Sequence, residues 1–115
     1  MAEKFLRGKV AIAVSDMKKS IQFYTKTLGF SLSEDYGDWA EIKGPGITLG
    51  LYPSEPCKKG GNLSVGFEVN DLDKATKALA KKGVKFDFFE EDYMRFAYFS
   101  DPDGTELYLA QKKRS

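Results

Sequence analysis

The sequence contains no histidine and only one cysteine, Cys57, and these absences exclude much of enzyme chemistry. Without histidine there is no Ser-His-Asp or Cys-His catalysis, no histidine general base and no histidine-containing metal site. A single cysteine allows neither a disulfide within the chain nor a cysteine metal cage. Because the sequence shows no base that would activate Cys57, we interpret it as an ordinary surface thiol.

Long apolar runs and an excess of one charge are also missing. No stretch approaches the roughly 18 apolar residues that a membrane span needs. Residues 1–10 contain no apolar segment typical of a secretion signal. The formal net charge is +1 over 115 residues, so we expect neither nucleic acid nor a membrane as a partner. The composition predicts a soluble, cytoplasmic chain folded as one domain over residues 1–115.

What the chain does contain is a repeat. The segments "AIAVSDMKKS" (residues 11–20) and "GFEVNDLDKA" (residues 66–75) share an apolar run, an aspartate and a polar stretch with lysine. Each apolar run predicts a buried strand, and each aspartate, Asp16 or Asp71, predicts the N-cap of a helix. Three further strand-like runs follow each helix, separated by turn motifs such as "GPG" and "DPDG". The sequence therefore predicts an α+β fold of two βαβββ modules, at about residues 8–52 and 63–111, joined by a linker at residues 53–62.

Glycines are expected to end the two helices, at Gly29 and Gly83. The expected strands of the first module are Lys9–Val14, Phe30–Glu34, Trp39–Lys43 and Ile47–Tyr52, and those of the second are Leu63–Val69, Val84–Phe88, Met94–Phe99 and Glu106–Gln111.

Alternation along the strands predicts which side chains the helices cover. The more apolar set includes Val10, Ile12, Val14, Leu49, Leu51, Val65, Phe67, Leu107 and Leu109. The opposite face combines small residues with charges and aromatic rings, a mixture typical of a ligand pocket. A face of this kind can equally well pack on another subunit or lie in water. Its candidate binding residues are Lys9, Trp39, Glu41, Thr48, Gly50, Tyr52, Ser64, Glu68, Glu106 and Tyr108, together with Arg95, whose strand face the pattern leaves open.

Three motifs in order resemble the vicinal oxygen chelate superfamily, also called the glyoxalase/bleomycin-resistance/dioxygenase family. They are "VAIAVSDMKKSIQFYTKTLGF", "VGFEVNDLDKATKALAKKGVKF" and "MRFAYFSDPDGTELYL". The resemblance implies paired βαβββ modules that form a cup-shaped, curved mixed sheet with the helices outside. It also implies a small-molecule ligand and a homodimer.

Active members of this family typically bind one divalent metal through histidine, glutamate or glutamine on the first, fourth, fifth and eighth strands. The matching positions here are Lys9, Gly50, Ser64 and Tyr108. An ammonium group has no lone pair, glycine has no side chain, and neutral hydroxyls are weak ligands. We therefore expect no metal and no cofactor. Glu41, Glu68 and Glu106 could form an oxygen site for a hard cation, but Lys9 would repel the ion.

Two function classes remain open, and a third possibility is a degenerate member whose pocket has filled and which serves only as an interaction module. The first is a metal-free small-molecule binding protein that sequesters a ligand or drug. The alternative is a lyase, isomerase or dioxygenase-like enzyme that uses the same cup with a non-standard metal or none, and with Lys9, a glutamate or Tyr108 as acid or base. No recognisable acid–base pair is present, which favours binding over catalysis. Lys9 is expected to pair with Glu68 or Glu106, as a structural ion pair or as an anchor for an anionic ligand.

Overall fold

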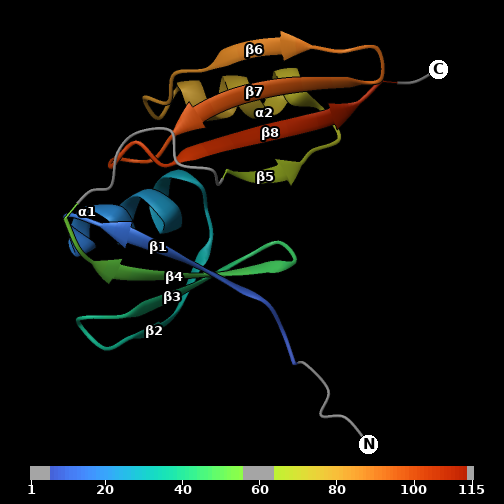
Figure 1. Cartoon of the computed structure of the whole chain (residues 1–115). Helices are drawn as coiled ribbons and strands as arrows, with labels where there is room; N and C mark the ends of the chain where they lie inside the picture. Colours follow the sequence, from blue (N-terminus) through green and yellow to red (C-terminus); the bar gives the residue numbers. More distant parts are fainter. Residues whose placement is uncertain (1–5, 56–63, 114–115) are drawn as a thin grey trace, which may run out of the picture. The chain divides into compact units, whose positions relative to one another are not determined.

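The computed structural model describes residues 6–55 and 64–113, and the chain divides into two compact units, Met1–Cys57 and Lys58–Ser115 (Figure 1). Each unit carries one four-stranded sheet and one helical segment in the order βαβββ. The structure is thus the α+β fold that the repeat predicts. Cys57 and most of the predicted linker lie outside the described residues.

The first unit runs through β1 (Lys9–Val14), α1 (Met17–Gln22), the π-helical turn η1 (Phe23–Thr27), β2 (Ser31–Asp35), β3 (Ala40–Gly44) and β4 (Ile47–Pro53). The strand order is β1-β4-β3-β2. The pair β1–β4 is parallel and the other two pairs are antiparallel, so the last strand of the unit lies beside its first.

The second unit repeats this arrangement with β5 (Val65–Glu68), α2 (Leu72–Ala80), β6 (Asp87–Glu90), β7 (Met94–Ser100) and β8 (Glu106–Lys112). Its strand order is β5-β8-β7-β6, again with a parallel first pair. Figure 1 shows α2 lying across one side of this sheet, where it contacts β7 and β8. Each of the two sheets therefore has one face under its own helix and one face without it.

Both predicted caps are confirmed. The Asp16 carboxylate accepts a hydrogen bond from the Lys19 backbone N–H at 3.0 Å, and Asp71 accepts one from Lys74 N–H at 3.0 Å. These bonds satisfy N–H groups that the first helical turn leaves without a partner. No helix in the described part of the chain is long and apolar enough to span a membrane.

Several strand ends differ from the sequence prediction by one or two residues, and two differences are larger. The first helix continues beyond Gln22 as a π-helix, in which Leu28 N–H bonds to the Phe23 carbonyl five residues earlier and so widens the last turn. The strand expected at Val84–Phe88 begins only at Asp87, because it pairs with β7 from that residue on.

Most residues of the predicted apolar faces form the core of each unit, whereas Val10 is only half-buried. Val14, Leu49, Leu51 and Leu107 have no exposed surface, and Ile12, Val65, Phe67 and Leu109 are also buried. The turn of the "DPDG" motif is held by the buried Asp101, whose Oδ1 accepts hydrogen bonds from the N–H groups of Asp103 and Thr105 at 2.9 and 2.8 Å. This turn sets the start of β8.

Candidate functional site

The face of the first sheet opposite the core, here called the first open face, carries Lys9, Ala11 and Ala13 of β1, Glu41 of β3, and Thr48, Gly50 and Tyr52 of β4. The strand register places Lys9 beside Thr48, Ala11 beside Gly50, and Gly50 beside Glu41. Because β4 lies between β1 and β3 and Gly50 has no side chain, long side chains from the two outer strands can meet across it.

Lys9 and Glu41 meet in this way. The Lys9 ammonium donates to Glu41 Oε2 at 2.6 Å, and the Trp39 indole N–H donates to the same oxygen at 3.0 Å. The Arg7 guanidinium lies 3.6 Å from Glu41 Oε1. The Glu41 side chain is only 7% exposed, whereas that of Lys9 is 42% exposed. The carboxylate is therefore held inside a shell of donors that remain partly open to solvent.

These donors stabilise the charged form of Glu41. The hydrogen bond from Lys9, followed by that from Trp39, lowers the pKa of the Glu41 carboxyl below its ordinary value, against the opposing effect of burial. Glu41 is thus an anion over the whole physiological range. The counter-charge of Lys9 is Glu41, in place of the expected Glu68 or Glu106. The strand pattern contained a signal for this pair, since Lys9 and Glu41 share a face and the only residues between them are small.

Trp39 lies directly over Gly50. A β-carbon built on Gly50 would come within 2.1 Å of Trp39 Cη2 and 2.3 Å of Cζ2, so the indole occupies the space that any other residue at position 50 would need. The Tyr52 ring lies beside it, with centroids 6.5 Å apart and ring planes within 18°. Tyr52 is 36% exposed. The two rings form an aromatic surface next to the Lys9–Glu41 pair.

The face of the second sheet opposite its core, the second open face, is also aromatic. Tyr108 lies over Gly66, where a β-carbon would approach Tyr108 Cζ to 2.0 Å. The Tyr108 ring contacts Tyr98 and Phe96 at centroid distances of 5.5 and 5.9 Å, and Phe96 contacts Phe89 at 6.3 Å. The sequence interpretation missed Phe89, Phe96 and Tyr98. The alternation in "MRFAYFS" contains the signal, because the register pairs Tyr98 with Tyr108.

The other candidates of the second unit lie at the ends of its strands. Ser64 precedes β5 and is exposed. Glu68 and Glu106 are exposed too, and Glu68 lies 4.0 Å from Lys112. None of these three makes a close polar contact with another candidate residue of the same unit.

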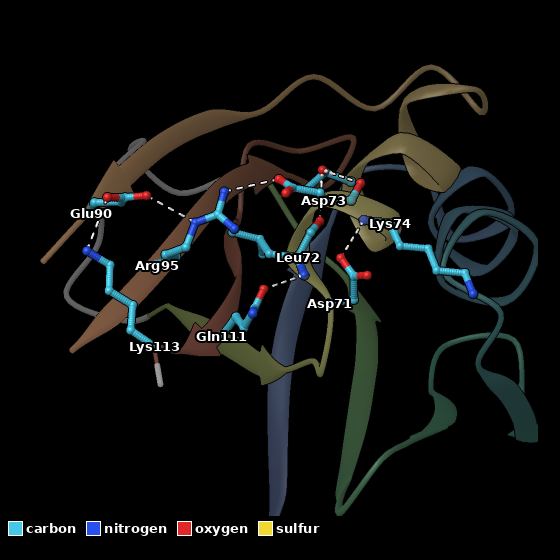
Figure 2. Close-up of polar contacts among 9 residues, drawn as sticks. Asp71, Leu72, Asp73, Lys74, Glu90, Arg95, Gln111 and Lys113 are labelled. Atoms are coloured by element: carbon cyan, nitrogen blue, oxygen red, sulfur yellow. Dashed lines mark hydrogen bonds and ion pairs between the residues drawn. The ribbon is translucent and has the colours of Figure 1, made fainter. Parts of the chain in front are cut away.

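Arg95 does not lie on the second open face. It is paired with Gln111, whose side chain accepts a hydrogen bond from the Leu72 backbone N–H at the start of α2. Arg95 donates to Asp73 of α2 at 3.0 Å and to Glu90 at 3.1 Å, as Figure 2 shows. The hydrogen bond from Arg95 lowers the pKa of Asp73. The placement of Arg95 among the ligand-binding residues is thus corrected: it joins α2 to its sheet.

The residues at the family's metal positions do not fit a metal ion. The Lys9 ammonium has no lone pair to offer a metal and pairs with Glu41, the space above Gly50 is filled by Trp39, and the Tyr108 ring is packed against Gly66. Within residues 6–55 and 64–113, no group of three or more histidine, cysteine, aspartate or glutamate side chains could hold a metal. We therefore derive no chemistry through a bound metal.

Comparison with known proteins places this geometry in a family. The model of the Glyoxalase/Bleomycin resistance protein/Dioxygenase superfamily matches residues 7–109, and the chain belongs to this superfamily as a member without the usual metal ligands. The chain is 32% identical to the uncharacterized protein YaeR of Escherichia coli, over 90% of this chain and 93% of that protein.

Two solved structures from Streptomyces sp. CB03234 are also similar. The antibiotic binding protein TnmS3 has a TM-score of 0.80 and 30% identity, covering 98% of this chain and 99% of its own. A glyoxalase/bleomycin resistance protein has a TM-score of 0.72 and 32% identity, covering 90% and 97%.

Proposed function

We propose that this protein binds and sequesters a small organic molecule, and that it does so without a metal ion. The observation that carries the proposal is the replacement of metal ligands by an ion pair and aromatic rings on the two open faces. Lys9 is bound to Glu41, and Trp39 covers Gly50. Rings that are partly exposed offer large, rigid contact surfaces to planar ligands. The similarity to an antibiotic binding protein supports the same function.

Catalysis on the first open face is a weaker candidate. A general base works best when its pKa lies near the working pH. The pKa of Glu41 is lowered by Lys9 and Trp39, which moves this carboxyl away from neutrality. With its lone pairs directed at several donors, Glu41 is built to hold neighbouring side chains in place and is a poor proton acceptor.

Metal independence is tested by elemental analysis of protein purified without chelator. We expect less than stoichiometric zinc, nickel, manganese and iron, because the family's ligand positions carry Lys9, Gly50, Ser64 and Tyr108. One equivalent of metal that survives dialysis and is lost with Glu68→Gln or Glu106→Gln would contradict the proposal.

Ligand binding is tested by a thermal-shift screen of planar aromatic compounds, run with and without EDTA. Compounds that raise the melting temperature should do so equally in both conditions. The shift should shrink in Trp39→Leu or Tyr108→Leu, which remove one ring from an open face. Tyr93→Leu is the matched control, because Tyr93 is 77% exposed and contributes to neither aromatic cluster. Compounds that need added metal, or whose shift of the melting temperature changes equally in all three variants, would argue against binding at these faces.

A further inference from the structure

The charges on the first open face do not cancel. The register places Lys43 on this face beside Thr48, and Glu34 beside Glu41. With Arg7 and Lys9, the face and its border carry three cations against the two carboxylates of Glu34 and Glu41. Glu34 is further engaged by the Tyr36 hydroxyl at 2.8 Å. On this face and at its border, the named cations therefore outnumber the named carboxylates by one.

The two cations that contact Glu41, Lys9 and Arg7, retain donors for another partner. An ammonium group has three N–H bonds and a guanidinium has five. Among residues 6–55 and 64–113, Lys9 donates one hydrogen bond, to Glu41, and its side chain is 42% exposed. The Arg7 side chain is 61% exposed and lies 3.6 Å from Glu41 Oε1, an ion-pair distance with no hydrogen bond. An anion at this point would gain charged hydrogen bonds without breaking the Lys9–Glu41 pair.

These donors are contiguous with the aromatic surface. The Trp39 indole N–H and the Lys9 ammonium share one oxygen of Glu41, so the polar edge of the indole lies beside the ammonium. Tyr52 extends the surface away from this point with a nearly parallel ring. A ligand whose ring contacts Trp39 and Tyr52 could thus present an acidic group to Lys9 and Arg7.

We infer that the ligand of the first open face is a planar aromatic anion, an aromatic ring system bearing a carboxylate or a comparable acidic group. This inference rests on the proposed binding function and specifies its ligand class. An aromatic cation would meet like charges here, and a neutral ring would leave the Arg7 and Lys9 donors without a ligand partner. In the competing explanation, Lys9 and Glu41 form a purely structural pair and the charge of a ligand is irrelevant.

Two probes of the same shape separate these explanations: naphthalene-2-carboxylate and its neutral carboxamide. Affinity is measured by titration calorimetry. The place of binding is followed through the indole N–H signal in a proton–nitrogen correlation spectrum, which is unambiguous because Trp39 is the only tryptophan. We expect both probes to shift this signal, and the carboxylate to bind about tenfold more tightly than the amide.

The variants Arg7→Gln and Glu41→Gln should change this preference in opposite directions. Arg7→Gln removes an exposed cation and should weaken carboxylate binding several-fold. Glu41→Gln keeps an acceptor for Trp39 but frees the Lys9 ammonium, and should tighten carboxylate binding. Amide binding should stay constant in both. Lys74→Gln removes an exposed charge from α2 of the other unit, and it is the control for net charge.

The possible results separate failure of the anion inference from failure of the proposed binding function. Equal affinity for the two probes at Trp39 overturns the anion inference and leaves the proposed binding function standing. If neither probe shifts the Trp39 signal at millimolar concentration, ligand binding on this face is itself wrong. If Glu41→Gln leaves carboxylate binding unchanged or weakens it, freeing the Lys9 ammonium does not favour an anion and the inference fails. Should Glu41→Gln not fold, an unchanged preference in the exposed Arg7→Gln variant overturns the inference by itself.

Discussion

Replacing Gly50 by alanine should test whether Trp39 is fixed over the first open face. The added β-carbon would lie 2.1 Å from Trp39 Cη2 and 2.3 Å from Cζ2. Non-bonded carbons need about 3.5–4.0 Å, so the indole has to recede by roughly 1.5 Å. That movement is incompatible with an unchanged 3.0 Å hydrogen bond from the indole N–H to Glu41. The substitution therefore acts on packing and on the polar network together.

The expected cost follows from two opposing effects. Overpacking of this kind usually costs about 1–3 kcal/mol. Alanine in a strand interior gains about 0.5–1 kcal/mol over glycine, because glycine loses more conformational entropy on folding. We expect Gly50→Ala to lower the free energy of unfolding by about 1–2 kcal/mol. In a Trp39→Ala background the obstructing ring is gone, and the same substitution should be neutral or slightly stabilising.

Urea unfolding of the wild type, Gly50→Ala, Trp39→Ala and the double variant measures the coupling energy between positions 39 and 50 directly. Gly8→Ala is the control, because no atom lies within 4 Å of a β-carbon at Gly8 and its stability should hardly change. The reasoning is refuted if Gly50→Ala costs the same with and without Trp39, since the cost would then come from the backbone.

Three further predictions follow from the cap, the buried carboxylate and the family. Asp71→Ala should cost about 1 kcal/mol in urea unfolding while Asp71→Asn costs less, and equal costs would argue against the cap. The pKa of Glu41 in the folded protein is lowered from 4.5. The contribution of ionised Glu41 to the free energy of unfolding is therefore complete above pH 4.5, and it is lost as the pH falls through the lowered pKa. Wild-type protein should lose more stability on acidification than Glu41→Gln, and parallel pH profiles would contradict this. We also propose, from the family resemblance, a homodimer; sedimentation should give twice the mass of one chain, and a monomer at all micromolar concentrations would refute it.

Local patterns in the sequence determined the architecture of each unit. The two Asp caps, the apolar alternation of β1 and β4 and the turn glycines are short-range signals, and each specifies its element through backbone geometry and burial. Where a boundary depended on pairing with another strand, as at β6, the sequence prediction was off by a few residues. The pattern of Val84 and Phe86 favours a strand, but extended backbone becomes a strand only where β7 offers partners.

The composition of the candidate site was also visible in the sequence, because alternation alone assigns Lys9, Gly50 and Tyr108 to open faces. The tertiary structure decided which side chains meet. It paired Lys9 with Glu41 across β4 and placed Trp39 over Gly50. It also directed Arg95 toward α2. Such contacts depend on the strand order β1-β4-β3-β2 and on rotamers that reach over a small neighbour. Sequence periodicity fixes the face on which a side chain lies, but only the folded register determines its partner, since that partner can come from a strand far away in the chain.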